Sequence, residues 1–507
     1  MSPRKAILMF FFASLVFRVT HCLVFANDII PGSDQMQEIL LGRKFASGDF
    51  YGVLDTYWAP FYPILIGIAS SFIDSPVIPA ALVSILTGSL IVPLTYIFVL
   101  QSYGRQEALI AGALALFFPH LINSVFAVGS ENVFIVLMLG VLITIWHALL
   151  TDSKLLCLAA GALLGFAYLS RPEAIGYSVA LVLIVITYNF WRKKPFLPNS
   201  LPQIAALLLG IFLFATPYIL YLRGETGRWT ISGKAEINTI VGELETEIDD
   251  AQRQTLGGPI KEFGKYFLFN LMEVQKTLPA LFPLLLWLLI GLGLFASPWG
   301  KERLEREAFV VFFFLVTIVG YAAAVVQLRY FYVLLPALFG WTACGIVIFT
   351  KWLSETAKGR GSNAAFLLRP LPLTTVLIAT IFLYLLPLNF YMRSTDRTWE
   401  ISGYEEREAG LWIRQNSKAD PYVFSASRRP VFYADARQLT PKTENVDEIL
   451  SEIKEQQVDY VVTSERSLKR NPFLTGLDRI LLNDSAFELV YETIPRPGYG
   501  ITIVRRR

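Results

Sequence analysis

The sequence has very few cysteine and histidine residues and little net charge. It holds three of each among 507 residues. The cysteines, at positions 22, 157 and 344, all lie in apolar stretches, so a disulfide framework is not expected. The scattered histidines and the absence of metal-ligand spacing exclude a His/Cys metal cluster. A formal net charge of +3 gives no indication of nucleic acid binding.

The sequence also lacks a glycine-rich phosphate-binding fingerprint, an internal repeat and a low-complexity linker. It is instead rich in apolar residues. Hydrophobic residues make up 54% of the chain, aromatic residues make up 14%, and the mean hydropathy is +0.50. This composition is too apolar for a soluble protein, and 507 residues allow more than one domain. We therefore expect a membrane protein.

About eleven stretches are long and apolar enough to cross a hydrocarbon core of roughly 30 Å. They are Ala6–Ala26, Val77–Leu100, Ala108–Ile122, Asn132–Leu150, Leu155–Leu169, Ala174–Phe190, Ile204–Leu222, Leu278–Ser297, Ala308–Gln327, Phe331–Thr350 and Leu371–Phe390. The first could be a signal peptide, with Ala26 as a possible cleavage residue. We interpret it as an uncleaved transmembrane helix, because it is long for a signal sequence and Arg18 interrupts it.

The stretch Ala59–Ile73 decides the topology. It is apolar but short, begins with Pro60 and Pro63, and has aromatic neighbours, which is typical of an interfacial or re-entrant segment. If it does not span, every clear basic cluster lies on one side, as the positive-inside rule requires. If it does span, the clusters at 192–194 and 301–306 move outside. We therefore predict an interfacial helix.

With this topology, three loops and the end of the chain lie outside the membrane. The loops are 27–58, 123–131 and 223–277. The composition becomes soluble in character near residue 394, with short strands expected at 422–425, 459–463, 487–491 and 501–504 and helices at 405–415 and 446–456. The predicted fold is mostly α: a polytopic helical membrane bundle over 1–393, with a small extracytoplasmic α/β domain over 394–507.

Two carboxylates on the predicted outer face are the first candidates for chemistry. Asp34 opens a predicted short helix, 35–46, where it could be an N-cap with Gln37 completing a capping box, or a general base. Glu131 lies at the start of a later span. It could simply begin that helix after Ser130, but a carboxylate so close to the hydrocarbon is costly unless it faces a wet cavity or a partner.

Two arginines lie at outer helix ends, against the positive-inside trend. Arg171, in YLSRPEAIGY, could bind a lipid phosphate through its bidentate donors or form a salt bridge with Glu173. Arg329, in VQLRYFYVLLP, could bind the same phosphate or extend to the lipid headgroups.

Aromatic residues cluster beside the proposed site. Tyr57, Trp58 and Tyr62 could stack on a sugar ring, or they could belong to the interfacial aromatic belt. His120 precedes Glu131 in the stretch FPHLINSVFAVGSENVF and completes the set of candidate substrate-binding residues. The long loop after residue 223 could order over a substrate, and its acidic run, 243–250, is interpreted as a solvated helix face.

These stretches together resemble the GT-C glycosyltransferases, most closely family thirty-nine. That family includes protein O-mannosyltransferases and the bacterial aminoarabinose transferase of lipid A. The first outer loop, with Asp34, Gly48 and the PxYP sequence at 60–63, is similar to the first outer loop of this group. GALLGFAYLSRPEAIG is similar to its GxxxGxxxLxRPEG stretch, and RYFYVLLP to its RY…P stretch.

The resemblance covers nearly the whole chain, and it departs from the family at three positions. The family often has Asp-Glu at the first motif where this chain has Asp34-Gln35, and its second-loop acid is frequently Asp rather than Glu131. The aminoarabinose enzyme has a lysine near the interfacial helix that helps to hold phosphate. This chain has no counterpart of that lysine, because Ala59 precedes Pro60.

What the resemblance implies is an inverting transfer from a polyprenyl-phosphate sugar on the extracytoplasmic side of the plasma (inner) membrane. Asp34 would be the catalytic base and Glu131 the second active-site acid, with Arg171 and Arg329 as candidates for the donor phosphate. The acceptor could be a protein, a lipid or a glycan. No cofactor is implied, and the metal requirement stays open.

Three alternatives remain at this stage. A transporter or flippase would place ionisable groups near mid-membrane and often carries inverted repeats, which are not visible here. A non-catalytic scaffold or sensor would use the C-terminal domain to bind partners. A phosphoglycan ligase would share the geometry but use a different donor.

Overall fold

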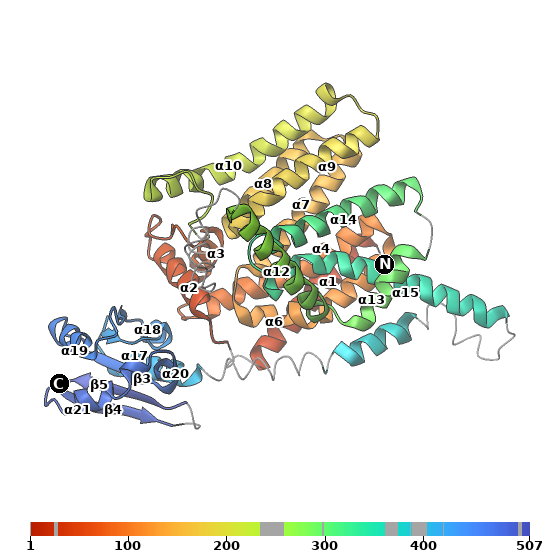
Figure 1. The fold of residues 1–507 in the computed structure, drawn as a ribbon. Helices are drawn as coiled ribbons and strands as arrows, with labels where there is room; N and C mark the ends of the chain where they lie inside the picture. The colour runs from red at the N-terminus through yellow and green to blue at the C-terminus, as the bar shows by residue number, and fades with distance from the viewer. Residues whose placement is uncertain are drawn as a thin grey trace.

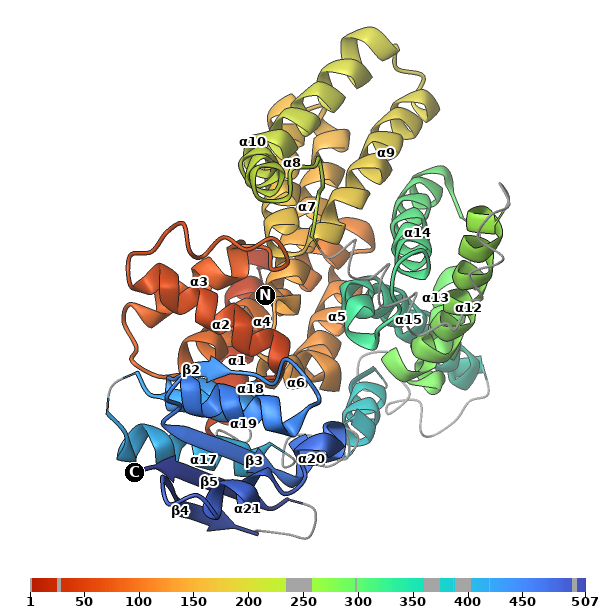
Figure 2. The same ribbon diagram turned by 60° about the vertical axis from the view of Figure 1, so that its left-hand side comes forward.

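The computed structural model describes residues 2–24, 29–233, 258–296, 299–359, 374–385, 387, 403–418, 420–494 and 499–507. It is a helical bundle with a small mixed α/β domain at one end (Figures 1 and 2), as the sequence predicted. The predicted domain boundary at 393/394, the possible cleavage residue Ala26 and the acidic run 243–250 lie outside the described residues.

The bundle is built from helices of very different lengths, from nine residues in α6 to 26 in α10. The first half of the bundle contains α1 (Pro3–Val24), α2 (Ser33–Ala46), α3 (Phe61–Ser70), α4 (Ile78–Ser102), α5 (Arg105–Phe117), α6 (Pro119–Ala127), α7 (Glu131–Thr151) and α8 (Lys154–Ser170). The second half contains η2 (Pro172–Gly176), α9 (Tyr177–Trp191), η3 (Phe196–Ser200), α10 (Leu201–Thr226), α12 (Gly258–Leu281), α13 (Leu284–Phe295), α14 (Lys301–Ala322), η5 (Leu328–Leu334), α15 (Leu335–Gly359) and a helix at Thr374–Leu385.

Each of the eleven predicted spans contains helix, but not all of these helices are long and apolar enough to cross a membrane. Within the described residues six meet that condition, or eight if each of two bent pairs counts as one span. The others are α8, with 17 residues, α14, whose first two turns are highly charged, and Thr374–Leu385. The chain is a multi-pass membrane protein.

Proline breaks two of the predicted spans. α5 and α6 meet at 44° beside Pro119, and α12 and α13 meet at 97° beside Pro283. A residue that precedes proline is pushed out of the helical region, which explains both positions. Helix also reaches into two stretches predicted as outer loops: α6 extends to Ala127 in 123–131, and α12 begins at Gly258 in 223–277.

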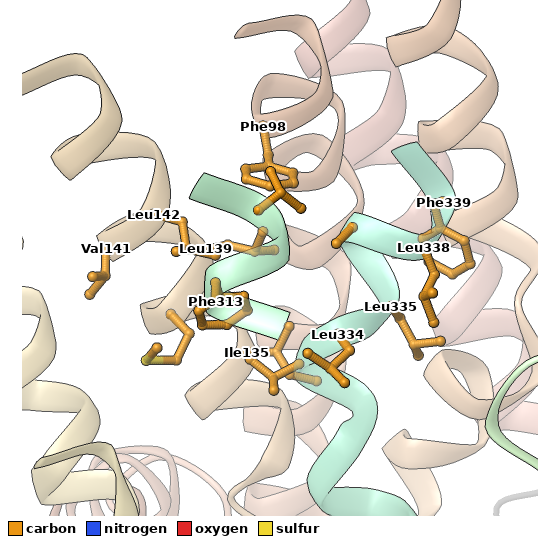
Figure 3. Packing of buried hydrophobic residues seen from close by; sticks show 14 of the residues in the cluster. Phe98, Ile135, Leu139, Val141, Leu142, Phe313, Leu334, Leu335, Leu338 and Phe339 are labelled. Carbon is orange, nitrogen blue, oxygen red and sulfur yellow. The ribbon is translucent and has the colours of Figure 1, made fainter. Parts of the chain in front are cut away.

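The core of the bundle lies between α4, α7, α14 and the segment formed by η5 and α15 (Figure 3). Phe98, Leu139, Phe313 and Phe339 are all buried there and come from these four elements in turn. Helices that are apolar on most sides are expected in such a position. Because lipid is as apolar as leucine, close packing rather than transfer from water holds these helices together.

The helices α2 and α3 cross each other in very close contact. A β-carbon on Gly42 would lie 2.9 Å from the Pro63 carbonyl oxygen, and one on Gly67 would lie 2.7 Å from the Gly42 carbonyl oxygen. α3 has ten residues, or about 15 Å of helix, which is about half the thickness of the hydrocarbon core. This length agrees with the predicted interfacial helix at 59–73.

The C-terminal domain is a five-stranded sheet in the order β2-β1-β3-β5-β4, with β2, β1 and β3 parallel and β5 and β4 antiparallel. Its strands are β1 (Tyr422–Phe424), β2 (Arg437–Leu439), β3 (Tyr460–Ser464), β4 (Phe487–Thr493) and β5 (Ile501–Arg506). Its helices are α17 (Tyr404–Asn416), α18 (Arg428–Ala434), α19 (Val446–Glu455), α20 (Glu465–Arg470), η6 (Pro472–Leu474) and α21 (Leu477–Leu482). The four predicted strands and two predicted helices are confirmed, while β2 was not predicted.

Candidate active site

A cavity of about 480 Å³ lies where α2 and α7 begin and α8 ends. Its wall comes from six parts of the chain: the start of α2, the loop before α3, the start of α7, the end of α8 with η2, the residues after α10, and the end of α14 with η5. Six of the eight candidate residues line it, namely Asp34, Glu131, Arg171, Arg329, Tyr57 and Trp58.

Asp34 lies in the first turn of α2, with its side chain about half exposed to the cavity. The N-cap of α2 is Gly32, and no side chain caps the helix, so the capping-box interpretation of Asp34 and Gln37 is wrong. A carboxylate in a first turn is favoured by the helix dipole. Oδ2 of Asp34 lies 3.9 Å from Nη2 of Arg329. Asp34 is therefore open to a ligand on one side and faces a cation on the other.

Glu131 is the first residue of α7, and its side chain is only 9% exposed. Its Oε1 lies 3.2 Å from Nη1 of Arg171 and 3.4 Å from Nη1 of Arg329. A carboxylate this buried needs such partners, because an unpaired charge at this depth is costly. Glu131 thus binds both arginines that the sequence singled out.

The two arginines differ in how much of each guanidinium remains available. Arg171 is 10% exposed, and its Nε donates to Glu173 at 2.6 Å while its Nη1 donates to Glu131. The salt bridge with Glu173 is therefore present, and Arg171 also lines the cavity. Arg329 is 35% exposed. Its contacts to Asp34 and Glu131 are longer, so it is the better placed of the two to bind an incoming anion.

The ring of Tyr330 contacts the guanidinium groups of both Arg171 and Arg329. The guanidinium carbon of Arg171 lies 4.5 Å from the centre of the Tyr330 ring, and that of Arg329 lies 5.5 Å from it. A ring face attracts a cation at such distances. Tyr330 belongs to η5, so this short helix carries one arginine and holds the second.

Tyr57 and Trp58 are fixed in the cavity wall by the turn that precedes them. The Oδ1 atom of Asp55 accepts hydrogen bonds from both backbone amides, at 2.7 Å and 2.9 Å. This is the local Asx turn that aspartate favours. Tyr218 of α10 donates to the Asp55 carbonyl at 2.8 Å, which ties the loop to the bundle. Burial, followed by the nearby charge of Asp34, raises the pKa of Tyr57.

Tyr62 and His120 do not line this cavity, so the structure does not bring them together with the other six candidates. Tyr62 is fully buried between α2, α3 and α4, and its hydroxyl donates to the Val128 carbonyl. His120 is 4% exposed, with Nε2 lying 3.0 Å from the Ala280 carbonyl and Nδ1 lying 3.3 Å from the Tyr332 hydroxyl. Their helix faces point into the protein, which the one-dimensional pattern of aromatic residues did not reveal.

Glu38, which was not among the predicted site residues, also lines the cavity and is 8% exposed. It lies four residues after Asp34 in a helix that had been predicted, and residues so spaced share one face. That spacing could have identified it. Arg18, which interrupts the first apolar stretch, is buried, and it donates to Ser14 and to the Leu121 carbonyl.

Within the described part of the chain, no group of three His, Cys, Asp or Glu residues is arranged to hold a metal ion.

Comparison with known proteins supports the resemblance in sequence and in fold. Residues 58–220 match the family described as dolichyl-phosphate-mannose-protein mannosyltransferase. No curated protein matches the chain in sequence. The structure resembles ArnT from Cupriavidus metallidurans bound to undecaprenyl phosphate, with a TM-score of 0.60, 14% identity, and coverage of 96% of this chain and 97% of that one.

The apo state of the same ArnT gives a TM-score of 0.58 at 15% identity, again over 96% and 97% of the two chains. The apo oligosaccharyltransferase of Archaeoglobus fulgidus gives 0.56 at 12% identity, over 98% of this chain and 74% of that one. The comparisons support the predicted resemblance: the chain shares the fold of these two proteins over nearly its whole length, and residues 58–220 match the protein mannosyltransferase family in sequence.

Proposed function

We propose that this protein is a membrane glycosyltransferase that moves a sugar from a polyprenyl-phosphate donor to an acceptor hydroxyl on the extracytoplasmic side. The observation that carries this proposal is one shared cavity. It places a half-exposed carboxylate, Asp34, opposite a partly exposed guanidinium, Arg329. Transfer from a phosphate leaving group needs both a base for the acceptor and a cation for the phosphate.

In this mechanism Asp34 accepts the proton of the acceptor hydroxyl. The acceptor oxygen then forms a bond to the anomeric carbon while the bond from that carbon to the phosphate oxygen breaks. One displacement inverts the anomeric configuration. The proton ends on Asp34, and the electron pair of the broken bond leaves with the polyprenyl phosphate.

Arg329 is proposed to bind that phosphate, because it is the more exposed arginine and a guanidinium can donate two parallel hydrogen bonds. Arg171 is already bound to Glu131 and Glu173, so its proposed role is to hold Glu131 in place. Glu131, the second active-site acid, is proposed to be the counter-ion of Arg329 until the donor phosphate replaces it. Tyr57 and Trp58 line the wall where the sugar would lie.

The fold comparison is consistent with a lipid-linked donor, since ArnT was solved with undecaprenyl phosphate bound and also covers this chain almost completely. A transporter or flippase is the competing proposal. It would use the charged cavity to pass a substrate rather than to react with it. The ion pairs of this cavity, Arg171–Glu131, Arg329–Glu131 and Arg329–Asp34, lie at helix ends rather than at mid-helix, which favours chemistry at a membrane surface.

The test measures released carrier, so it does not require the sugar to be known. The protein in nanodiscs would be mixed with total lipid and envelope extract from its own host, and free polyprenyl phosphate would be followed by mass spectrometry. The Asp34→Asn variant should lower the release rate by about 10²–10⁴-fold, because it removes the base. A matched control, Asp49→Asn, changes a loop carboxylate that does not line the cavity. Near-normal release by Asp34→Asn would remove the proposed role.

A further inference from the structure

The helix α18 of the C-terminal domain has two buried faces that belong to different parts of the protein. Val431 and Ala434 pack into the core of the domain itself. Phe432 and Tyr433, 3% and 2% exposed, pack instead into a cluster formed by the membrane domain. One short helix therefore joins the two cores.

The membrane-domain side of this contact is α2. Met36 and Ile39 of α2 belong to the same cluster as Phe432. Figure 2 shows the C-terminal domain lying against this end of the bundle, with α18 facing α2. Large aromatic side chains that are almost fully buried dominate the energetics of such contacts.

A polar contact fixes the register of the two helices. Nη1 of Arg43, near the end of α2, donates to Oδ1 of Asp435 at 2.9 Å. The same guanidinium lies 4.8 Å from the centre of the Phe432 ring. Asp435 ends α18 in the left-handed conformation, with φ +54°, which aspartate and asparagine tolerate better than most residues.

The opposite face of α2 forms part of the cavity. Asp34, Gln35 and Glu38 line it, whereas Met36 and Ile39 face the cluster that contains Phe432. A helix moves as a rigid element, so a rotation or tilt of α2 displaces Asp34 together with the contacts to α18. Arg43 lies roughly 13 Å along the helix from Asp34. Over this distance, a small tilt of α2 at its Arg43 end would shift the Asp34 carboxylate.

We infer that the C-terminal domain is a brace for the active site: α18 clamps α2 through Phe432 and the Arg43–Asp435 pair, and so positions Asp34 in the cavity. Arg43, Phe432 and Asp435 are then positioning residues, because none of them lines the cavity. A shift of about 1 Å in a reacting group can cost about 10²-fold in rate, so even a partial release of α2 is measurable.

The test uses the full-length protein in nanodiscs and hydrogen–deuterium exchange of the α2 amides. Phe432→Ala and Asp435→Asn should each speed that exchange, by roughly threefold or more for Phe432→Ala and by less for the polar substitution. Val431→Ala is the control on the same helix, because it changes the domain core and not the docking face. Asp420→Asn is the control for the ion pair, since Asp420 also has a left-handed φ of +55° and pairs with Arg437 at 3.0 Å.

Turnover gives a second readout, which rests on the proposed function, whereas the exchange measurement does not. Phe432→Ala should lower kcat by roughly tenfold and leave the donor KM unchanged, because the arginines stay in place while the base shifts. The brace would be overturned if the α2 amides of Phe432→Ala exchanged at the wild-type rate. It would also be overturned if Val431→Ala accelerated their exchange as much as Phe432→Ala does. Faster α2 exchange with unchanged kcat would overturn the positioning of Asp34. If the wild-type protein releases no carrier, the proposed function is contradicted. The hydrogen exchange of α2 would still test whether the C-terminal domain braces this helix.

Discussion

The guanidinium of Arg329 and the carboxylate of Asp34 face each other across the cavity, with Nη2 and Oδ2 3.9 Å apart. One residue comes from the start of α2 and the other from η5, so all the helices from α3 to α14 lie between them in sequence. In the ligand-free protein, the cation proposed for the phosphate thus neutralises the proposed base. A bound phosphate would compete for Arg329 and leave Asp34 available to the acceptor, which implies that the donor binds first.

Arg329→Lys should weaken donor binding while keeping the charge. Lysine lacks the planar fork that binds two phosphate oxygens, and a hydrogen bond to a charged group contributes about 1.5–3 kcal/mol. The donor KM and the Kd for undecaprenyl phosphate should therefore rise by roughly 10–100-fold. Arg223→Lys is the control, because Arg223 stacks on Trp229 at 4.2 Å and does not line the cavity. Equal affinities for wild type and Arg329→Lys would contradict the assignment.

Glu131→Gln should have opposite effects on stability and on phosphate binding. It removes the shared counter-ion of Arg171 and Arg329, so unfolding should become easier by about 1–3 kcal/mol. The same change removes a competing anion, so undecaprenyl phosphate should bind more tightly. Differential scanning fluorimetry and a binding titration measure the two quantities. The comparison is Glu173→Gln, which leaves the Glu131–Arg329 contact intact. Weaker phosphate binding by Glu131→Gln would argue that Glu131 does not compete with the donor.

Gly67→Ala should disturb the active site from outside it. Its methyl group would lie 2.7 Å from the Gly42 carbonyl oxygen, so α2 must move away from α3. Such overpacking typically costs about 1–3 kcal/mol, and here it should also lower turnover, because α2 carries Asp34. Gly320→Ala is the control, since a methyl group on that helical glycine meets open space. Unchanged carrier release by Gly67→Ala would show that the site tolerates a displaced α2.

Glu405 should make the C-terminal domain less stable as the pH rises. Burial raises the pKa of this carboxyl, at the start of α17, to about 7, with Glu406 adding to the shift. A carboxyl whose pKa is higher in the folded state favours folding when protonated. Its contribution is complete below pH of about 4.5 and is lost as the pH rises through about 7, with a ceiling of about 3 kcal/mol.

Glu405→Gln should remove that dependence and slow hydrogen exchange of α17 at pH 7.5 relative to wild type. The measurement is amide exchange of α17 peptides in the full-length protein at pH 5.5 and 7.5, corrected for intrinsic rates. Glu408→Gln, on the same helix, serves as the control. An identical pH dependence in wild type and Glu405→Gln would show that another group is responsible.

The sequence was a good guide to spans and to residues at helix ends. Length and apolarity predicted the helices of the bundle, and charge identified Asp34, Glu131, Arg171 and Arg329, because a charged residue beside hydrocarbon needs a reason to be there. All four line one cavity. Glu131 is more buried, and more fully paired, than a loop position suggested.

The errors have a common cause, which is that a sequence does not state which way a side chain points. Tyr62 lies beside the predicted site in sequence but turns into the cluster between α2 and α4, and His120 turns toward Ala280. The helix α12 was missed because charged residues interrupt its apolar stretch. The docking of Phe432 on α2 depends on tertiary contact between distant segments, and no local pattern encodes it.

The most direct test of the account is the position of the phosphate in a cryo-electron microscopy structure of the protein with undecaprenyl phosphate in nanodiscs. The phosphate is predicted within hydrogen-bond distance, roughly 2.7–3.2 Å, of the Arg329 guanidinium and in the cavity that Asp34 lines. A phosphate bound at another place, or separated from Asp34 by protein, would contradict the proposal that these two residues share one reaction.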